Sequence, residues 1–564
     1  MSDRELLDAP DTIPIAIIPQ PRTERDESRP SRRQEREQRE RERRRGLSRG
    51  TTMLPPALVT LALGAYQIGT PQVREDESAT WWAAHLSWNN LGRLLDNTDV
   101  VLAPYYVLMH LWVSVAGSSA VMLRLPSLLA MTATAAALAL LGRRMFDAPT
   151  GLIGGLVFAV LPATARYAQD ARPYALSALS VVVGALLLYR ALDHDGADRW
   201  GGYALGMLFT GLFHPVAATV VAAYLLIVLA TERQRTGAWF AVTLVPVAPL
   251  FAVLMLARGQ NHQHPNGGTN VDALLHLPQD LLGSAHVALA VGLLALFGVL
   301  LGRRNGIPLL VWAVLPPVVL FGLRSYANVF TPAYFVFTVP ALALLAGAGV
   351  CALGRELPGK AGSVVPRQIA AGLVALAAVG AVSVMALPTL RDDPQHGAYD
   401  FRAAARYVAL QQKPGDGIVY SGQLDVATRA MAYHLRGAAQ PLSGVYVMVP
   451  PEQDGTYTGT PCAAPVVCTK GVDRIWLVST ADAATPYAGM TADQGAFLQT
   501  EYKPSIAREF AGGLRITLFE RVPDNGAAGQ KPGTTKQTGT AKQAGATQKS
   551  GTQKAGATDK AGNG

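Results

Sequence analysis

Long apolar runs separated by short charged breaks dominate the sequence between residues 50 and 390. Met53–Thr70 is the first run, and nine more follow it. About 20 apolar residues cross the hydrocarbon layer of a membrane as a helix, so we predict a polytopic α-helical membrane protein. The run 202–231 is long enough for two helices broken near Pro215, which brings the predicted number of spans to about eleven. The later runs lie at about 124–142, 150–165, 174–192, 202–231, 237–257, 284–302, 307–323, 334–353 and 367–388.

Basic residues at the breaks set the predicted orientation. Residues 29–49 hold ten Arg and four Glu just before the first run, and pairs such as Arg143 and Arg144 fall at alternate later breaks. Because basic loops favour the cytoplasmic side, we place the N-terminus in the cytoplasm and everything after residue 390 outside the plasma membrane. No small-residue cleavage site follows the first run, so we interpret it as a retained span. Val101–Val115 is also apolar, but spanning there would reverse every later assignment, so we predict a half-buried or re-entrant outer helix.

Normal polarity returns at residues 391–522, where short apolar strands alternate with helical stretches. This alternation predicts a small α/β domain outside the membrane. Cys462 and Cys468 lie within it with five residues between them, and outside the cell they could pair. The predicted strands are Gly417–Tyr420, Arg474–Val478 and Leu514–Phe519, and the predicted helices are Phe401–Gln411 and Asp425–Leu435.

The overall composition agrees with this division of the chain. Half of the 564 residues are hydrophobic and 16% are charged, against about 25% in an ordinary soluble domain, which excludes a single soluble globule. Most of the formal net charge of +9 lies in the tails, 1–50 and 523–564, which we predict to be disordered. No patch of interleaved basic and aromatic residues accompanies that charge, so we expect no nucleic-acid partner.

The first outer loop carries the acidic run Glu75, Asp76 and Glu77, followed by Trp81 and Trp82. Tryptophans suit the membrane interface. A carboxylate held there beside aromatic rings could act as a general base with a raised pKa. The alternative is a solvated loop that keeps the first two spans apart, since exposed acids are common.

The second outer loop places Arg166, Asp170, Arg172 and Tyr174 within nine residues between apolar runs. One interpretation is a structural ion pair between Arg166 and Asp170 at helical spacing. The other is a phosphate clamp, for which the guanidinium fork is well suited.

Other isolated polar residues stand in apolar surroundings. An ionisable group at membrane depth is a functional candidate, although lone histidines are more often hydrogen-bonded core residues. The run 261–266 contains two histidines and could bind a metal, but Gly267 and Gly268 follow it and no acid or thiol lies beside it, which favours a flexible loop. We therefore assign no cofactor and leave a divalent metal as an open alternative. The isolated polar residues are Asp99, His110, Arg124, His214 and Arg324.

Three segments resemble the membrane glycosyltransferases of GT-C fold that use polyprenyl-phosphate sugars, the superfamily of protein O-mannosyltransferases and aminoarabinose transferases. Arg74–Ala83 looks like the first-loop Asp-Glu motif of that family. Arg124–Ser127 resembles its arginine at the next span, and Arg166–Leu176 its second acidic loop. The region after residue 390 looks like the outer domain of actinobacterial mannosyltransferase-like members.

The resemblance implies roles for individual residues. Asp76 would deprotonate the acceptor hydroxyl, with Glu77 beside it and Asp170 as a second acid. Arg124 and Arg172 would hold the lipid phosphate. Further candidate substrate-binding residues are Asp99, Tyr105, Arg166, Tyr174, His214 and Arg324.

Two departures from the family pattern bear on the metal and on one phosphate contact. Many members have His-Pro-Pro or Glu-Lys-Pro-Pro after the first loop, where this chain reads Asp99–Tyr106. Related chains often have Pro-Arg-Tyr before the tenth span, where this chain has Pro332, Ala333 and Tyr334. Arg324 could substitute for the missing arginine.

The resemblance implies an enzyme that moves a sugar, mannose or a related one, from a polyprenyl-phosphate donor to a hydroxyl of a glycan, lipid or protein. The reaction would take place at the outer membrane face as a direct displacement with inversion. The competing interpretation is a polytopic transporter or flippase of an envelope lipid or glycan precursor. Transporters usually have repeated halves, and we find no repeat in this sequence.

Overall fold

The computed structural model describes residues 47–194, 196–260, 270–324, 330–358, 364–391, 399–422, 424, 426–482 and 485–523. The described residues up to Arg521 fall into one compact unit. Almost all of the two tails predicted to be disordered, and the histidine-containing run 261–266, lie outside the described residues.

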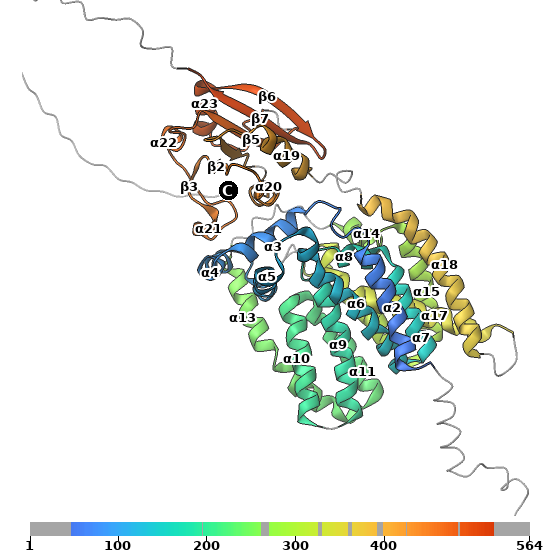
Figure 1. The fold of residues 1–564 in the computed structure, drawn as a ribbon. Coiled ribbons are helices and arrows are strands. Elements are labelled where there is room, and N and C mark those ends of the chain that lie inside the picture. Colours follow the sequence, from blue (N-terminus) through green and yellow to red (C-terminus); the bar gives the residue numbers. More distant parts are fainter. Residues whose placement is uncertain are drawn as a thin grey trace, which may run out of the picture. The chain divides into compact units, whose positions relative to one another are not determined.

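Helices account for nearly all of the described chain between residues 49 and 391 (Figure 1). Polar caps begin several of them: Ser48, Ser119 and Asp147 each accept a hydrogen bond from a backbone N–H of the first turn that follows. The first group of helices is α2 (Arg49–Ala65), α3 (Glu75–His85), α4 (Trp88–Asn97), η1 (Val100–Leu102), α5 (Ala103–Ala116), α6 (Ala120–Met145), α7 (Ala148–Val160), α8 (Pro162–Ala168) and α9 (Tyr174–Asp193). The second group is α10 (Ala197–Phe213), η2 (Pro215–Val220), α11 (Val221–Thr231), η3 (Arg233–Arg235), α12 (Thr236–Leu244), α13 (Val247–Arg258), α14 (Val271–Leu282), α15 (Ala285–Leu301), η4 (Arg303–Asn305), α16 (Gly306–Gly322), η5 (Pro332–Thr338), α17 (Val339–Glu356) and α18 (Val364–Arg391).

Several helices are long and apolar enough to cross a membrane. Among the described residues there are four, or up to seven if each of three bent helix pairs is one span. The predicted break near Pro215 is confirmed, because α10 ends at Phe213 and η2 begins at Pro215. The sequence did not predict α14, which meets α15 at a 90° bend. The number of eleven spans stays a prediction.

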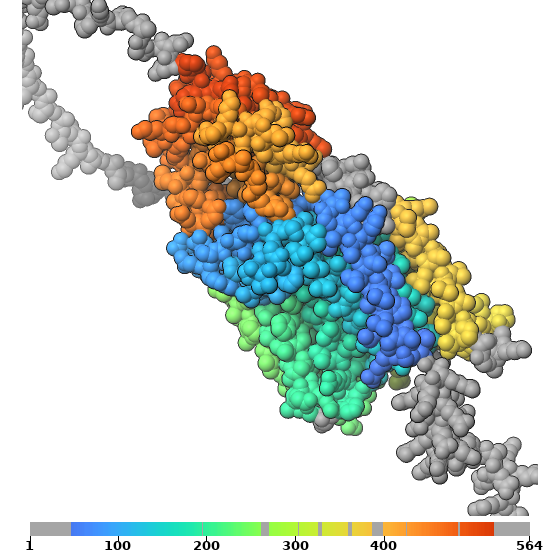
Figure 2. Space-filling view, viewed as in Figure 1, coloured from blue at the N-terminus to red at the C-terminus, as the bar shows by residue number. Residues whose placement is uncertain are grey.

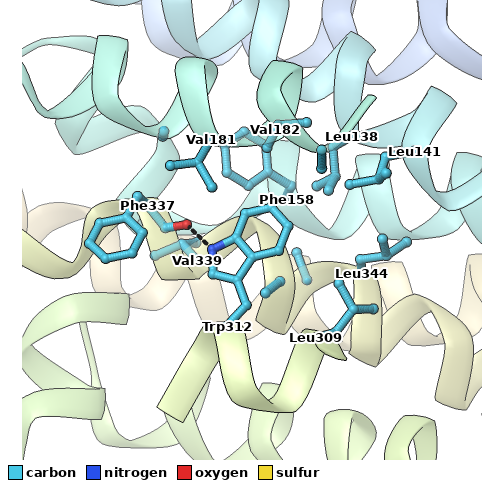
Figure 3. Close-up of a cluster of buried hydrophobic side chains, with 14 of the residues drawn as sticks. Leu138, Leu141, Phe158, Val181, Val182, Leu309, Trp312, Phe337, Val339 and Leu344 are labelled. Carbon is cyan, nitrogen blue, oxygen red and sulfur yellow. Dashed lines mark hydrogen bonds between the residues drawn. The ribbon is translucent and has the colours of Figure 1, made fainter. Parts of the chain in front are cut away.

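The helical core is packed closely around aromatic and small residues. Trp312 on α16 is 1% exposed and donates its indole N–H to the carbonyl oxygen of Phe337 over 2.8 Å (Figure 3). Leu138 and Phe158 belong to the same buried cluster. Between α15 and α17, a side chain at Gly298 would collide with the Leu345 carbonyl, so glycine permits the close approach of these two helices.

Large apolar side chains also cover the outside of the helical part. Helices α2 and α18 form part of the surface drawn in Figure 2, in blue and yellow. On α2, Leu54 and Leu58 are 51% and 61% exposed, and on α18, Leu373 and Val374 are 61% and 72% exposed. Extended apolar surface of this kind is what a lipid bilayer covers, which agrees with a multi-pass membrane protein.

The C-terminal α/β region, residues 399–521, is built on a five-stranded sheet of order β2-β1-β5-β7-β6. Strands β2, β1 and β5 pair in parallel, and β7 pairs antiparallel with β5 and β6. Cys462 and Cys468 form the predicted disulfide. The strands are β1 (Gly417–Tyr420), β2 (Ser443–Gly444), β3 (Val447–Val449), β4 (Thr460–Pro461), β5 (Arg474–Thr480), β6 (Tyr502–Phe510) and β7 (Leu514–Arg521). The helices are α19 (Phe401–Gln411), α20 (Ala427–Leu435), α21 (Pro451–Asp454), α22 (Pro465–Cys468) and α23 (Ala492–Glu501).

Candidate active site

A buried ion pair joins the start of α3 to α6. Glu77 and Arg124 are each 1% exposed, and Arg124 Nη2 lies 2.6 Å from Glu77 Oε2 while its Nε lies 2.7 Å from Oε1. The Glu77 carboxylate also accepts the backbone N–H groups of Arg74, at 3.0 Å, and Ala171, at 3.1 Å. Burial raises the pKa of Glu77, but the charge and hydrogen bonds of Arg124 outweigh burial, and with Arg74 they lower that pKa to about 2. A carboxylate held this firmly in its ionised form is a poor general base.

The surroundings of Arg124 change the role expected for it. Besides Glu77, its guanidinium donates to the carbonyl oxygens of Ile68, Pro71 and Gln72 over 2.8 to 3.2 Å. A guanidinium has five N–H groups, and the oxygens of this chain occupy them all. The prediction that Arg124 holds a lipid phosphate therefore does not match the structure, because no donor is left for one. Arg124 instead ties α6 to the segment before α3.

Asp170 forms a second ion pair, with Arg74, close to the Glu77–Arg124 pair. It is 3% exposed, and its Oδ1 is 2.7 Å from Arg74 Nη2. The predicted Arg166–Asp170 ion pair does not form: Arg166 is exposed, and its guanidinium lies 5.5 Å from the centre of the Tyr167 ring. Burial raises the pKa of Asp170; Arg74 opposes that rise, whereas Glu77 and Asp76 add to it.

Side-chain hydrogen bonds hold the backbone of the second outer loop against α3 and α6. The Thr80 hydroxyl donates to the Ala171 carbonyl over 2.8 Å, and the Ser127 hydroxyl donates to the Arg172 carbonyl over 3.4 Å. Together with Glu77 on the Ala171 N–H, these contacts hold the backbone that carries Arg172. The residues of the two outer-loop motifs thus form one framework.

Arg172 is the charged side chain that this framework leaves unpaired. Its Nε is buried and has no hydrogen-bond partner, and no described residue forms an ion pair with its guanidinium. Two carboxylates, Asp76 and Asp99, and two phenols, Tyr106 and Tyr174, lie close enough to interact electrostatically with it. A half-buried guanidinium whose Nε is buried and without a partner favours an external anion.

Aromatic side chains line the neighbourhood of Arg172. The ring centroids of His214 and Tyr334 are 4.7 Å apart, and those of Tyr174 and Tyr334 are 6.1 Å apart. The Arg172 guanidinium lies 6.0 Å from the Tyr174 ring centre and interacts electrostatically with Tyr105, His214 and Tyr334 as well. The Tyr105 hydroxyl and the Nδ1 of His214 are buried without a hydrogen-bond partner among the described residues. Unpaired donors and acceptors beside a cation are typical of a ligand-binding site.

Asp76 and Asp99 are two carboxylates that interact electrostatically with this arginine. Asp76 is exposed at the second position of α3, next to Glu77. Asp99 has a positive φ of 58°, and its Oδ2 accepts the hydroxyls of Tyr457, at 2.7 Å, and Tyr106, at 3.2 Å. Tyr457 belongs to the C-terminal α/β region, so that region reaches the same assembly.

The recorded contacts of Arg324 are with Phe321 and not with the residues around Arg172. It is exposed, donates to the Phe321 carbonyl at 2.9 Å and stacks over the Phe321 ring at 4.2 Å. Within the part of the chain that the structure describes, no group of three or more His, Cys, Asp or Glu side chains could hold a metal ion.

No local signal in the sequence gave a role to Arg74, Tyr334 or Tyr457. Arg74 stands inside the first-loop motif, and its spacing from the acids was the signal that could have pointed to it. Tyr457 lies in a turn of the α/β region, where nothing in the local sequence indicates a contact with residue 99.

The fold and site define a polytopic helical membrane protein with a half-buried arginine, whose buried Nε has no partner, close to two carboxylates at the ends of apolar helices. Residues 101–257 match the family model described as dolichyl-phosphate-mannose-protein mannosyltransferase. The solved structure of ArnT from Cupriavidus metallidurans in the apo state is 14% identical, with a TM-score of 0.52, and the match covers 82% of this chain and 97% of ArnT. ArnT bound to undecaprenyl phosphate gives a TM-score of 0.51 with the same identity and coverage.

A more distant match is the oligosaccharyltransferase AglB from Archaeoglobus fulgidus, in complex with an inhibitory peptide and a dolichol-phosphate. It is 12% identical, with a TM-score of 0.48, over 85% of this chain and 74% of AglB. No curated protein sequence matches the chain significantly. At these identities the ArnT likeness shows the fold, and with the family model it confirms the resemblance to GT-C glycosyltransferases that use polyprenyl-phosphate sugars.

Proposed function

We propose that this protein transfers a sugar, mannose or a related one, from a polyprenyl-phosphate donor to a hydroxyl acceptor at the outer face of the plasma membrane. The observation that carries the proposal is Arg172, whose buried Nε has no partner and whose neighbours are aromatic rings and two carboxylates. A polyprenyl phosphate brings an anion to the membrane surface on an apolar tail. ArnT, which shares the fold, has been solved with undecaprenyl phosphate.

Arg172 would bind the phosphate and stabilise it as it leaves. The leaving group of a polyprenyl-phosphate sugar is already an anion, so a fixed cation is more useful than a general acid. Because Glu77, Thr80 and Ser127 hold the loop backbone, the backbone that carries Arg172 is positioned before the donor arrives. Tyr174 and His214 supply polar and aromatic contacts to the sugar or phosphate.

Asp76 would be the base that deprotonates the acceptor hydroxyl. Of the acids Asp76, Glu77 and Asp170, it is the exposed one, whereas Glu77 and Asp170 are buried in ion pairs with Arg124 and Arg74. A base must be free to accept a proton, which favours Asp76 over its two neighbours. Attack on the anomeric carbon from the face opposite the phosphate would form the new glycosidic bond with inversion.

The test is a transfer assay in membranes with a radiolabelled mannosyl polyprenyl phosphate. We expect labelled product from the wild type and a large loss from Arg172→Ala, since the arginine both binds the donor phosphate and stabilises the charge that builds on it as it leaves. Arg166→Ala, at an exposed arginine of the same loop, is the matched control and should retain activity. Accumulation of unchanged donor on the opposite membrane face, without product, would instead favour a flippase.

A further inference from the structure

A turn of the C-terminal α/β region is tied to helix α4. The Arg93 side chain donates to the Gln453 carbonyl over 3.1 Å, and the Asn97 amide lies 3.3 Å from the carbonyl oxygens of both Asp454 and Gly455. These contacts join residues that lie more than 350 positions apart in the sequence.

Gly455 makes this close approach possible. Its φ is +75°, and a Cβ there would lie 2.8 Å from Asn97 Nδ2 and 2.9 Å from the Arg93 backbone. Next to it, the Asp454 carboxylate accepts the hydroxyls of Thr456, at 2.7 Å, and Thr460, at 2.6 Å. The turn is therefore internally braced and fitted against α4.

The turn places the Tyr457 hydroxyl within hydrogen-bonding distance of Asp99. Tyr457 donates to Asp99 Oδ2 over 2.7 Å, Tyr106 reaches the same oxygen at 3.2 Å, and the two phenol oxygens are 3.2 Å apart. Arg429 on α20 stacks over the Tyr457 ring at 4.2 Å. Asp99 has a left-handed backbone conformation, with a φ of 58°, which aspartate adopts more readily than most other residues that have a Cβ.

The charge of Asp99 acts on the same arginine as the proposed donor phosphate. Asp99 interacts electrostatically with Arg172, after Tyr174, Tyr106 and Asp76 in strength, and Tyr106 is itself hydrogen-bonded to Asp99. A carboxylate free to move there would compete for the guanidinium and repel a phosphate. Two hydroxyl donors on one oxygen disperse that charge and fix its place.

We propose that Tyr457 is a positioning residue that, through Asp99, keeps Arg172 available for the donor phosphate, so that the phosphate site depends on the C-terminal α/β region. This inference rests on the proposed function in one respect, namely that Arg172 binds a polyprenyl phosphate. It assigns no catalytic step to Tyr457.

The experiment measures binding of undecaprenyl phosphate to the full-length protein in detergent, as a change in tryptophan fluorescence. The variants are Tyr457→Phe, Asp99→Asn and the double variant. We expect Tyr457→Phe to weaken binding about tenfold, the low end for a hydrogen bond to a charged group. In the Asp99→Asn background, Tyr457→Phe should change affinity less than twofold, because the Asp99 carboxylate charge that Tyr457 holds in place is absent.

Tyr446→Phe is the matched control. It removes the hydroxyl of another buried tyrosine of the α/β region, one that bonds to the Gln494 carbonyl at 3.5 Å, and should leave affinity unchanged. Gly455→Ala is a second route to the same effect, since its Cβ would displace the turn. It too should weaken binding only while Asp99 is present.

The outcomes separate the two proposals. If the wild type does not bind undecaprenyl phosphate, the proposed function fails together with this inference. If the wild type binds it and Arg172→Ala does not, then unchanged binding by Tyr457→Phe and Gly455→Ala overturns the inference alone. An equal loss from Tyr457→Phe with and without Asp99 would also overturn it, because Tyr457 would then act as a general structural contact.

Discussion

Replacing Glu77 with glutamine tests whether the buried ion pair holds the two outer-loop motifs together. The substitution keeps the shape of the side chain but leaves Arg124 buried without a counter-charge. The lowering of the Glu77 pKa from 4.5 to about 2 corresponds to a stabilisation of about 3 kcal/mol. That agrees with the roughly 3–5 kcal/mol lost when one partner of a buried ion pair is removed.

The assay is equilibrium unfolding of the purified protein in detergent, followed by tryptophan fluorescence. Glu232→Gln, at an exposed carboxylate, is the control and should cost under about 0.5 kcal/mol. The double variant Glu77→Gln, Arg124→Gln should be less destabilised than the sum of the single variants, since it leaves no lone charge buried. A loss from Glu77→Gln as small as the control's, or strict additivity, would refute the reasoning.

The same ion pair gives a pH dependence of known sign. The pKa of Glu77 is lower in the folded state than in the unfolded state. The ionised Glu77 therefore stabilises the fold fully above about pH 4.5, and this stabilisation is lost as the pH falls through about 2. The difference in unfolding free energy between wild type and Glu77→Gln should therefore shrink between pH 5 and pH 2. A difference that grows on acidification would contradict the assignment.

Two further predictions concern the base and the orientation of the chain. Asp76→Asn should leave the protein folded and able to bind donor but should slow transfer about 10² to 10⁴-fold, the usual contribution of a positioned base; wild-type turnover would move the role to Asp99. A cysteine replacing Gly437 in the α/β region should react with a membrane-impermeant thiol reagent on intact cells, and one replacing Gln234, between two arginines, should react only after lysis. Reversed labelling would place the proposed site in the cytoplasm.

The sequence predicted the elements whose signal is local. Apolar length located most of the helices, and the break at Pro215 followed from the loss of a helical N–H and the restriction of the preceding residue. The strands β1, β5 and β7 and the disulfide between Cys462 and Cys468 were likewise recognisable from short patterns. Helix α14 was missed because its apolar residues alternate with Asp272, Gln279 and Asp280, which resembles a polar loop.

The site could be predicted only as a set of residue types. The sequence indicated that arginines and acids of two outer loops act together, but it could not pair them. At helical spacing Asp170 is equally compatible with Arg166 and with a distant partner, and the structure selects Arg74. Nothing in the sequence distinguishes Arg124 from Arg172. In the structure, backbone carbonyls accept hydrogen bonds from Arg124, whereas the Nε of Arg172 has no partner. Partnerships of this kind depend on tertiary distances that no local pattern encodes.

The most direct test of the central claim is an experimental structure of the protein with undecaprenyl phosphate. Our account predicts phosphate density within hydrogen-bonding distance of the Arg172 guanidinium, with the Arg124–Glu77 ion pair intact beside it. Phosphate density on Arg166 or Arg324, with Arg172 still unpaired, would contradict it.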